Sequence, residues 1–185
     1  MLKWLIENGE FDLNARNDAG YTPLLTAAFY EANDCFQYLL EIRDIKWMKR
    51  NDDGETVLHI LAKSKNHPDS PPVIRKKLGS KDKKDVMMIR DNADNTPLHT
   101  AVCSNQLAIC EELVGVTNDN TTPSASKNII GKKNALGQTA IHVACKMGHI
   151  AIVKYFWEVT GEDPKGELSR RDDDRQSCLH LAAAE

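Results

Sequence analysis

The sequence predicts an all-α fold, a solenoid of stacked helix-turn-helix units, and three observations support this prediction. A seven-residue block recurs five times: TPLLTAA from Thr22, TVLHILA from Thr56, TPLHTAV from Thr96, TAIHVAC from Thr139 and SCLHLAA from Ser177. The block starts lie 34, 40, 43 and 38 residues apart, as in repeat proteins with insertions between units. Between the blocks, apolar residues spaced by three and four indicate second helices over residues 34–42, 107–114 and 149–157.

Residues 2–14, which precede the first block, have the pattern of a second helix and the loop that leaves it. The last block runs into residues 182–185 while still in a helical pattern. A repeat cannot bury its apolar face alone, so both ends look cut and we expect a fragment of a longer protein.

Each block is expected to begin an inner helix. Its Thr or Ser suits the N-cap, where the hydroxyl accepts a free backbone N–H, and Pro23 and Pro97 suit the first helical turn. The next apolar residue and the small residue three positions later share one helical face, although the second block has Leu61 in the small position. These positions are Leu24, Leu58, Leu98, Ile141 and Leu179, with Ala27, Ala101, Ala144 and Ala182.

A turn is predicted ahead of each block. An Asn or Asp is followed three residues later by Gly in three of the five turns, and Gly is free to adopt positive φ. These pairs are Asn17 with Gly20, Asn51 with Gly54, and Asn134 with Gly137. Asp94 and Arg175 stand where the other turns have Gly, so we expect the turn of residues 172–176 to be the least secure.

The blocks and their turns are similar to those of the ankyrin-repeat family, whose block is T-P-L-H-x-A. The resemblance implies an ankyrin-repeat solenoid in which helix-turn-helix units are joined by β-turn or hairpin fingers. It also implies a groove, formed by fingers and inner helices, that binds protein partners. We therefore expect one ankyrin-repeat domain over 1–185: 1–16 the end of a preceding repeat, 17–50 repeat 1, 51–90 repeat 2 with an insertion, 91–133 repeat 3 with an insertion, 134–171 repeat 4, and 172–185 the start of repeat 5.

Composition excludes several other classes of protein. A net charge of −3 argues against a general nucleic-acid binder. Five cysteines without a C-x-x-C pair predict neither a disulfide framework nor a zinc site, so we expect a reducing cytoplasmic setting, with the nucleus as the alternative. Apolar runs are far shorter than the roughly 20 residues that cross a bilayer, which predicts no membrane insertion by this chain.

Partner-binding residues are expected on the fingers and the exposed ends of inner helices. Phe29 and Tyr30 on the first inner helix, with Tyr21 on the adjacent finger, form a candidate aromatic anchor. The alternatives are that these rings pack on the incomplete preceding repeat and that the finger residues are ordinary solvated turns. The remaining candidates are Asp53, Glu55, Asn95, Leu136, Gln138, Lys146 and Met147.

The sequence predicts no catalytic residues, no metal site and no cofactor. It contains no G-x-S-x-G, H-E-x-x-H or P-loop motif, and its acidic runs fall in turns. His59, His99, His142 and His180 recur at one position of the block, which predicts a structural ladder of hydrogen bonds rather than converging zinc ligands. The cysteines carry no signature of a reactive thiol.

Two insertions lengthen repeats 2 and 3. In the first, Ser70-Pro71-Pro72 predicts a short helix to about Leu78. The basic residues that follow could contact an anionic partner, although a solubilising loop is the alternative: they are Arg75, Lys76, Lys77, Lys81, Lys83 and Lys84. Deletion of residues 81–84 is expected to leave thermal stability nearly unchanged. The second insertion, residues 117–133, is polar and expected to be mobile.

These features favour a non-catalytic scaffold that binds another protein. A narrower resemblance in layout is to IκB-type inhibitors, which mask Rel-type transcription factors. It rests on GETVLH from Gly54, NTPLHTAVCSNQLAICEELV from Asn95 and GQTAIHVACKMGHIAIVKYF from Gly137, with a TTP-containing insertion between the last two. A third possibility is the cytosolic ankyrin array of a TRP-type ion channel or receptor.

Overall fold

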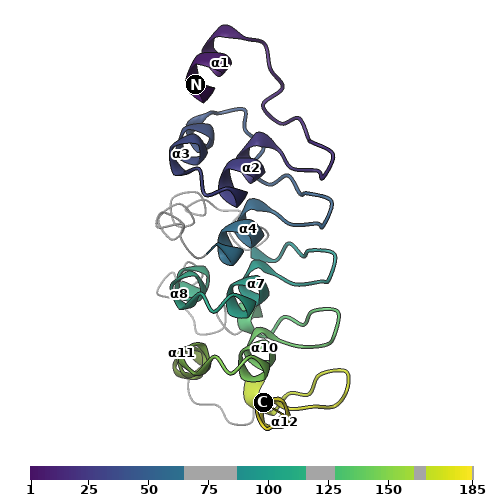
Figure 1. The fold of residues 1–185 in the computed structure, drawn as a ribbon. Helices are drawn as coiled ribbons and strands as arrows, with labels where there is room; N and C mark the ends of the chain where they lie inside the picture. The colour runs from purple at the N-terminus through teal and green to yellow at the C-terminus, as the bar shows by residue number, and fades with distance from the viewer. Residues whose placement is uncertain (65–86, 116–127, 161–165, 185) are drawn as a thin grey trace.

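The computed structural model describes residues 1–64, 87–115, 128–160 and 166–184. Its inner helices form one column, and the finger turns project to one side of them (Figure 1). The inner helices, which contact one another in chain order, are α2 (Pro23–Phe29), α4 (Val57–Lys63), α7 (Pro97–Cys103), α10 (Ala140–Lys146) and α12 (Cys178–Ala182). The predicted all-α ankyrin-type solenoid is confirmed.

A second column of helices packs behind the inner one, away from the fingers (Figure 1). It contains α1 (Leu2–Asn8), α3 (Asn33–Glu41), α8 (Leu107–Gly115) and α11 (Ile150–Thr160), and a short 3₁₀ turn, η1 (Glu167–Ser169), follows α11. The helices expected over 34–42, 107–114 and 149–157 are present with shifted ends. The largest difference is in α11, which continues three residues further, to Thr160, whose hydroxyl donates to the carbonyl oxygen of Phe156 at 2.8 Å.

The inner helices begin as the capping rule predicts. Thr22 Oγ1 accepts the backbone N–H of Leu25 at 3.4 Å, with Pro23 in the first turn. In the four later blocks the histidine at the third helical position completes a capping box, because its Nδ1 accepts the backbone N–H of the capping Thr or Ser. The Thr/Ser-x-x-His spacing therefore fixes the starts of these four helices locally.

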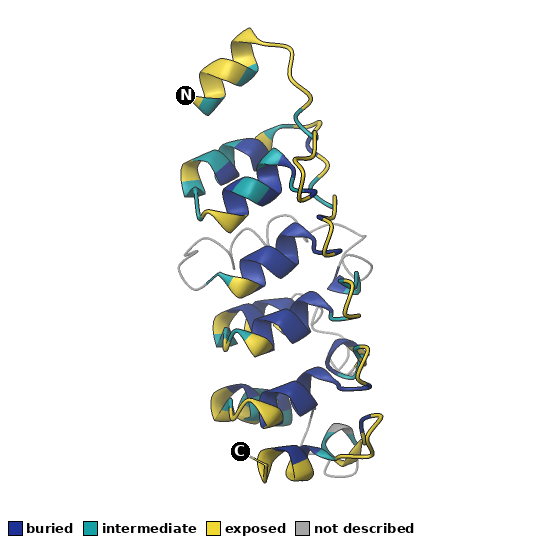
Figure 2. Ribbon diagram, turned by 45° about the vertical axis from the view of Figure 1, so that its right-hand side comes forward, coloured by how far each residue is buried: buried dark blue, intermediate teal, exposed yellow. Residues whose placement is uncertain are grey.

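The core is continuous from repeat to repeat, and burial is concentrated on α4, α7 and α10 (Figure 2). Phe36 and Phe156 anchor the outer column, and Leu61 is fully buried at the position where other repeats have alanine. One expectation is wrong. The end of the second insertion is ordered, because residues 128–130 are helical and Ile129 and Ile130 are buried in the core, whereas residues 117–127 lie outside the described residues. Two adjacent apolar side chains at the end of a polar segment were the available signal.

The fingers are closed by one repeated hydrogen-bond pattern. In the first, the N–H of Asn17 donates to the carbonyl of Tyr21 at 3.0 Å, and the same bond closes the other four fingers. Gly20, Gly54 and Gly137 have φ between 68° and 78°, as the turn chemistry predicts. Asp94 and Arg175 adopt the same left-handed conformation, with φ of 58° and 61°. The turn of residues 172–176 thus forms like the others, and Arg175 adopts the strained left-handed conformation that the turn requires.

Replacing Arg175 with glycine should increase the free energy of unfolding by about 0.5–1 kcal/mol. Relief of the left-handed conformation gains roughly 1–2 kcal/mol, and the larger backbone entropy of unfolded glycine offsets part of it. Urea unfolding followed by circular dichroism measures the change. Asp174→Gly is the control, because Asp174 in the same turn does not have positive φ and should lose stability instead.

Successive repeats are joined by buried histidines. Nε2 of His59 donates to the carbonyl of Asn95 at 3.1 Å, His99 reaches Gln138 at 3.1 Å, and His142 reaches Arg170 at 2.9 Å. In each residue Nδ1 accepts from the capping threonine, so the ring is neutral, with its proton on Nε2. Burial lowers the pKa of all three imidazoles, and lowers that of His99 to about 4. The recurrent histidines are therefore structural, as predicted.

Candidate partner-binding face

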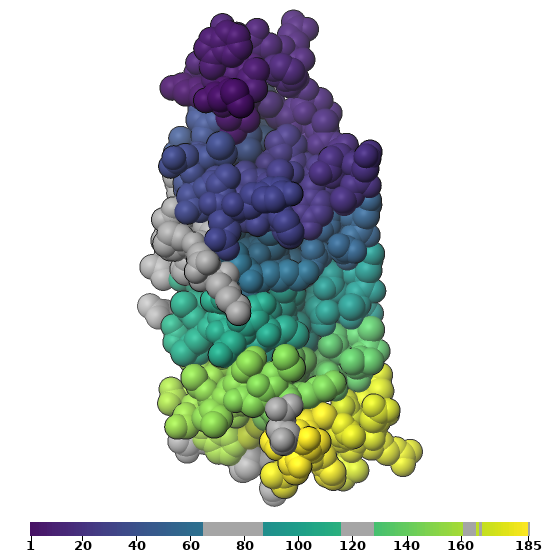
Figure 3. Space-filling view, in the orientation of Figure 1, coloured from purple at the N-terminus to yellow at the C-terminus, as the bar shows by residue number. Residues whose placement is uncertain are grey.

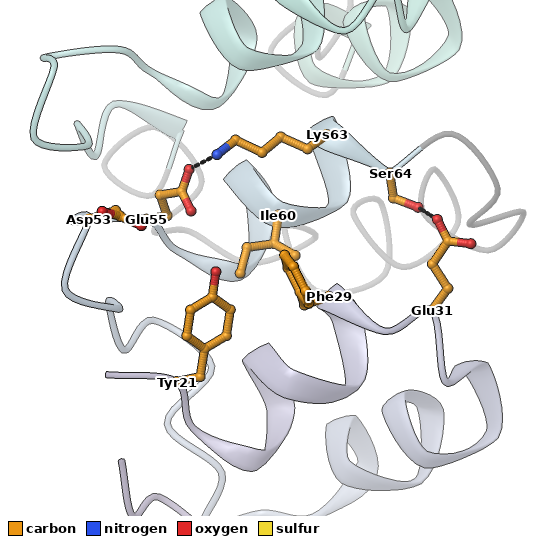
Figure 4. Close-up of a pocket in the computed structure, with 8 residues that line it drawn as sticks. All are labelled: Tyr21, Phe29, Glu31, Asp53, Glu55, Ile60, Lys63 and Ser64. Carbon is orange, nitrogen blue, oxygen red and sulfur yellow. Dashed lines mark hydrogen bonds and ion pairs between the residues drawn. The ribbon is translucent and has the colours of Figure 1, made fainter. Parts of the chain in front are cut away.

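A pocket of about 570 Å³ lies where the first two fingers meet the first two inner helices. Tyr21 and Asp53 enter it from the fingers, and Phe29, Ile60 and Lys63 from the helices (Figure 4). The full lining is Tyr21, Phe29, Glu31, Asp53, Glu55, Ile60, Lys63 and Ser64. Its volume is in the range of ligand pockets, and it combines aromatic and carboxylate groups.

Two aromatic rings, of Tyr21 and Phe29, line this pocket, and the ring of Tyr30 packs against Phe29. Phe29 is 54% exposed and Tyr30 75% exposed, and Tyr21 is half-buried. The rings of Tyr21 and Phe29 meet edge to face with centroids 5.5 Å apart, and those of Phe29 and Tyr30 do so at 5.2 Å. The first inner helix, α2, and the first finger therefore carry an aromatic cluster at the surface. Packing on a preceding repeat does not bury Phe29 and Tyr30 in this structure.

The carboxylates of the pocket differ in their partners. Glu55 is buried, accepts from Asn51 Nδ2 at 3.0 Å, and forms an ion pair with Lys63. Desolvation lowers the pKa of Lys63, but the hydrogen bond and charge of Glu55 outweigh it, so the pKa is raised. Glu31 accepts from the Ser64 hydroxyl at 2.6 Å, and Asp53 is exposed. Lys63 thus neutralises Glu55, while Glu31 and Asp53 have no salt bridge within the described residues.

Glu31 is held in a strained backbone conformation. Its φ is 55°, and the matching positions after later inner helices hold Asn105 and Gly148, also with positive φ. Asparagine and glycine adopt this conformation more readily than glutamate. The chain therefore places a carboxylate at the pocket at some cost in backbone energy, and such strain clusters at functional sites.

Besides Tyr21, three of the predicted contact residues stand directly before a capping Thr, and these three are wholly or partly buried. Glu55 and Gln138 are buried, and Asn95 is half-buried. Asn95 Oδ1 accepts from Asn134 Nδ2 at 3.0 Å, and Gln138 Nε2 donates to the carboxylate of Asp172 at 3.3 Å. Asn95 and Gln138 thus hold neighbouring fingers together, and Glu55 is bound to Asn51 of its own finger and to Lys63, so a direct contact with a partner is not the role their geometry supports.

Repeat 4 has a second, smaller exposed group. Leu136 at its fingertip is 57% exposed and Met147, the C-cap of α10, is 46% exposed, with Lys146 exposed beside it. The structure brings Tyr21, Phe29, Tyr30 and Asp53 together near the first pocket and leaves Leu136, Lys146 and Met147 further down the stack. The basic residues from Arg75 to Lys84 and the short helix predicted from Ser70 lie outside the described residues.

One group of residues was missed in the sequence. The position six before each capping residue is basic throughout: Arg16, Arg50, Arg90, Lys133 and Arg171. We call these residues the basic ladder. Arg50 donates to the carbonyl of Gly54 in its own finger at 2.8 Å and to that of Arg90 in the next at 2.7 Å. Arg90 reaches Lys133, and Lys133 reaches Arg171, in the same way. Their fixed register was the signal that could have identified them.

The described residues contain no group of three or more His, Cys, Asp or Glu side chains that could hold a metal ion. Among the cysteines, burial raises the pKa of Cys110 to about 12. Cys145 differs, because a hydrogen bond with Cys178 lowers its pKa. Within the same described ranges, no helix combines the length and apolarity needed to cross a bilayer.

Comparison with known proteins identifies the repeats. A family model described as ankyrin repeats (three copies) matches residues 1–85 and 123–185, and a model of the single ankyrin repeat matches residues 93–122. One relative is an ANK repeat-containing protein, nipk-1, of Caenorhabditis elegans, 34% identical over 105 residues. Another is human NF-kappa-B inhibitor alpha, 28% identical over 133 residues. A third is the Drosophila melanogaster transient receptor potential cation channel subfamily A member 1, 24% identical over 174 residues.

These alignments cover 55%, 71% and 93% of this chain, respectively. They cover only 16%, 38% and 14% of the relatives. The chain thus spans well under half of each relative's length, and the similarity is one of repeats.

Proposed function

We propose that this chain, which belongs to the ankyrin-repeat family, is a non-catalytic module that binds a partner protein along the groove of its inner helices and fingers. The observation that carries the proposal is the exposed cluster of Tyr21, Phe29 and Tyr30 beside a polar pocket. Exposed aromatic rings on rigid elements are the typical anchors of protein interfaces, because burying them removes large apolar surfaces at a low cost in conformational entropy.

The second exposed group supports an extended contact rather than a single pocket. Leu136, Lys146 and Met147 belong to repeat 4, while the aromatic cluster belongs to repeat 1. The repeats are stacked in chain order along one axis (Figure 3). A partner that touches both groups would span several fingers, as expected for a solenoid with a continuous binding surface.

Two narrower functions are alternatives within this proposal. An inhibitor that masks a Rel-type transcription factor is favoured by the alignment with NF-kappa-B inhibitor alpha over 71% of the chain. An ankyrin array of a TRP-type channel is favoured by the longer alignment, over 93% of the chain, with the Drosophila channel. Sequence beyond this chain, with or without a block of membrane-spanning helices, would separate the two. We propose a cytoplasmic location, with the nucleus as the alternative, because all five cysteines are free thiols.

The direct test is the double substitution Phe29→Ala and Tyr30→Ala. We expect it to weaken partner binding about 30-fold, the effect of losing one interface hot spot of roughly 2 kcal/mol. Partners would be captured from cell extract, identified by mass spectrometry and then measured as purified proteins by titration calorimetry. Trp4→Ala is the matched control, since Trp4 is a 65% exposed aromatic residue on α1, away from the fingers. Equal binding by the folded double variant and the parent would refute the anchor.

A further inference from the structure

We propose that the pocket between repeats 1 and 2 receives an arginine side chain from an extended segment of the partner. This inference rests on the proposed function and adds the chemistry of the residue that is recognised. Four groups carry it: the rings of Tyr21 and Phe29 and the carboxylates of Glu31 and Asp53 (Figure 4).

Charge is the first argument. Among the described residues that line it, the pocket has three carboxylates, on Glu31, Asp53 and Glu55, and one ammonium group, on Lys63. The ion pair of Lys63 with Glu55 removes one charge of each sign, and the pocket keeps an excess of negative charge. Glu31 Oε1 accepts from Ser64, which orients the carboxylate without neutralising it. The complementary ligand group is therefore a cation, and a phosphate or a carboxylate would be repelled.

The aromatic rings decide which cation fits. Tyr21 and Phe29 meet at an interplanar angle of 77°, so the two ring faces point in different directions and a planar cation can stack on one of them. Guanidinium stacks on aromatic faces and donates in a fixed fork to carboxylates, whereas ammonium is a compact and strongly hydrated charge. Arginine therefore uses both features of the pocket, and lysine uses mainly its charge.

The backbone at Glu31 gives independent support. Its φ of 55° lies in the left-handed region. At the matching position, later repeats have Asn105 and Gly148 in the same conformation. Glycine at residue 31 would relieve the strain but would remove the carboxylate beside the pocket. A glutamate that is retained at an unfavourable φ is consistent with a binding role.

The experiment uses peptides of random sequence, because the partner is unidentified. A phage library of 12-residue peptides is selected on the full chain, and selected peptides are synthesised and measured by fluorescence anisotropy. We expect them to share an arginine at one position. Replacing this arginine with citrulline, which has a similar shape but no charge, should weaken binding at least tenfold. Peptides that share no basic residue, or that bind equally well with citrulline, would overturn the inference.

Protein variants locate the contact. Asp53→Asn and Glu31→Gln should each weaken the arginine peptide about tenfold and should have little effect on the citrulline peptide. Asp18→Asn, which removes an equally exposed charge on the first finger outside the pocket, should change binding less than threefold. Glu31→Gly is the control for misfolding. This variant should be at least as stable as the parent, so its loss of binding would report the loss of the carboxylate. Arginine peptides that respond equally to Asp18→Asn and Asp53→Asn would overturn the assignment to this pocket.

Failure of the inference and failure of the proposed function are distinguishable. Selected peptides that depend on Phe29 and Tyr30 but carry no arginine would overturn the arginine site and leave the binding face intact. Selected peptides, or purified partners, that bind the Phe29→Ala and Tyr30→Ala variant as well as the parent would overturn the face, and the arginine site with it.

Discussion

Replacing Gly54 with alanine should lower the free energy of unfolding by about 2–4 kcal/mol. Gly54 has φ of 78°, where an L side chain costs roughly 1–2 kcal/mol. A Cβ atom there would lie 2.5 Å from Asn92 Oδ1 and 2.9 Å from the backbone nitrogen of Asn92 in the next finger. The backbone cannot move aside without breaking the bond from Asn92 N–H to the carbonyl of Asp53, which is 2.9 Å long. The substitution therefore damages a junction between repeats as well as one turn.

Gly148→Ala is the control for this prediction. Gly148 has φ of 66°, and an added Cβ would have no atom of the structure within 4 Å. Its substitution carries the cost of the left-handed conformation alone, about 1–2 kcal/mol. Urea unfolding of both variants, followed by circular dichroism, gives the comparison. Equal losses of stability would mean that the close approach of the second and third fingers contributes nothing beyond backbone strain.

Acid should destabilise the array through His99. Burial lowers the pKa of His99 to about 4, against about 6.5 for an unperturbed histidine, so the unfolded chain binds more protons between these values. The stability from neutral His99 is complete above pH 6.5 and is lost as the pH falls toward 4. At roughly 1.4 kcal/mol per pH unit, lowering the pH from 7.5 to 5 should cost about 2 kcal/mol from this residue. His59 and His142 act in the same direction.

The measurement compares free energies of unfolding at pH 7.5 and pH 5 for the parent and for His99→Gln. The variant should be less stable at pH 7.5, because the bond to Gln138 is altered, but should lose less stability on acidification. His180→Gln is the matched control, because His180 caps α12 in the same way and is exposed. If His99→Gln loses as much stability as the parent between the two pH values, the titration of other groups explains the acid sensitivity. If His99→Gln does not fold, His142→Gln tests the same point.

The parts of the fold that follow from local chemistry could be predicted from the sequence. Thr22 and Thr96 begin inner helices because a hydroxyl and a following proline suit a helix start wherever they occur. Gly20 and Gly137 mark the turns because the left-handed conformation is a property of one residue. The aromatic cluster was predicted from the ankyrin resemblance, which implies that the inner-helix positions of Phe29 and Tyr30 are exposed beside the finger of Tyr21.

The contacts between repeats could not be predicted in the same way. Glu55 and Gln138 resemble fingertip residues in the sequence but are buried: Gln138 bonds to Asp172 of the next finger, and Glu55 pairs with Lys63. The positive φ of Glu31 was also missed, although Glu31 stands nine residues after its capping Thr, as Asn105 and Gly148 do in later repeats. The residues of the basic ladder could be identified from their register in the sequence, but their bonds could not, since Arg50 and Arg90 each bond to a residue about one repeat away.

Along the basic ladder, the length of a repeat varies independently of the position of its basic residue relative to the helix cap. Each rung stands six residues before a helix cap, and the extra residues of repeats 2 and 3 fall elsewhere in the chain, after α4 and after α8. A repeat can therefore gain residues without changing the register of its finger relative to the helix cap. The finger edge of the array therefore keeps one register, with a basic residue six positions before every helix cap, while the length of the repeats varies.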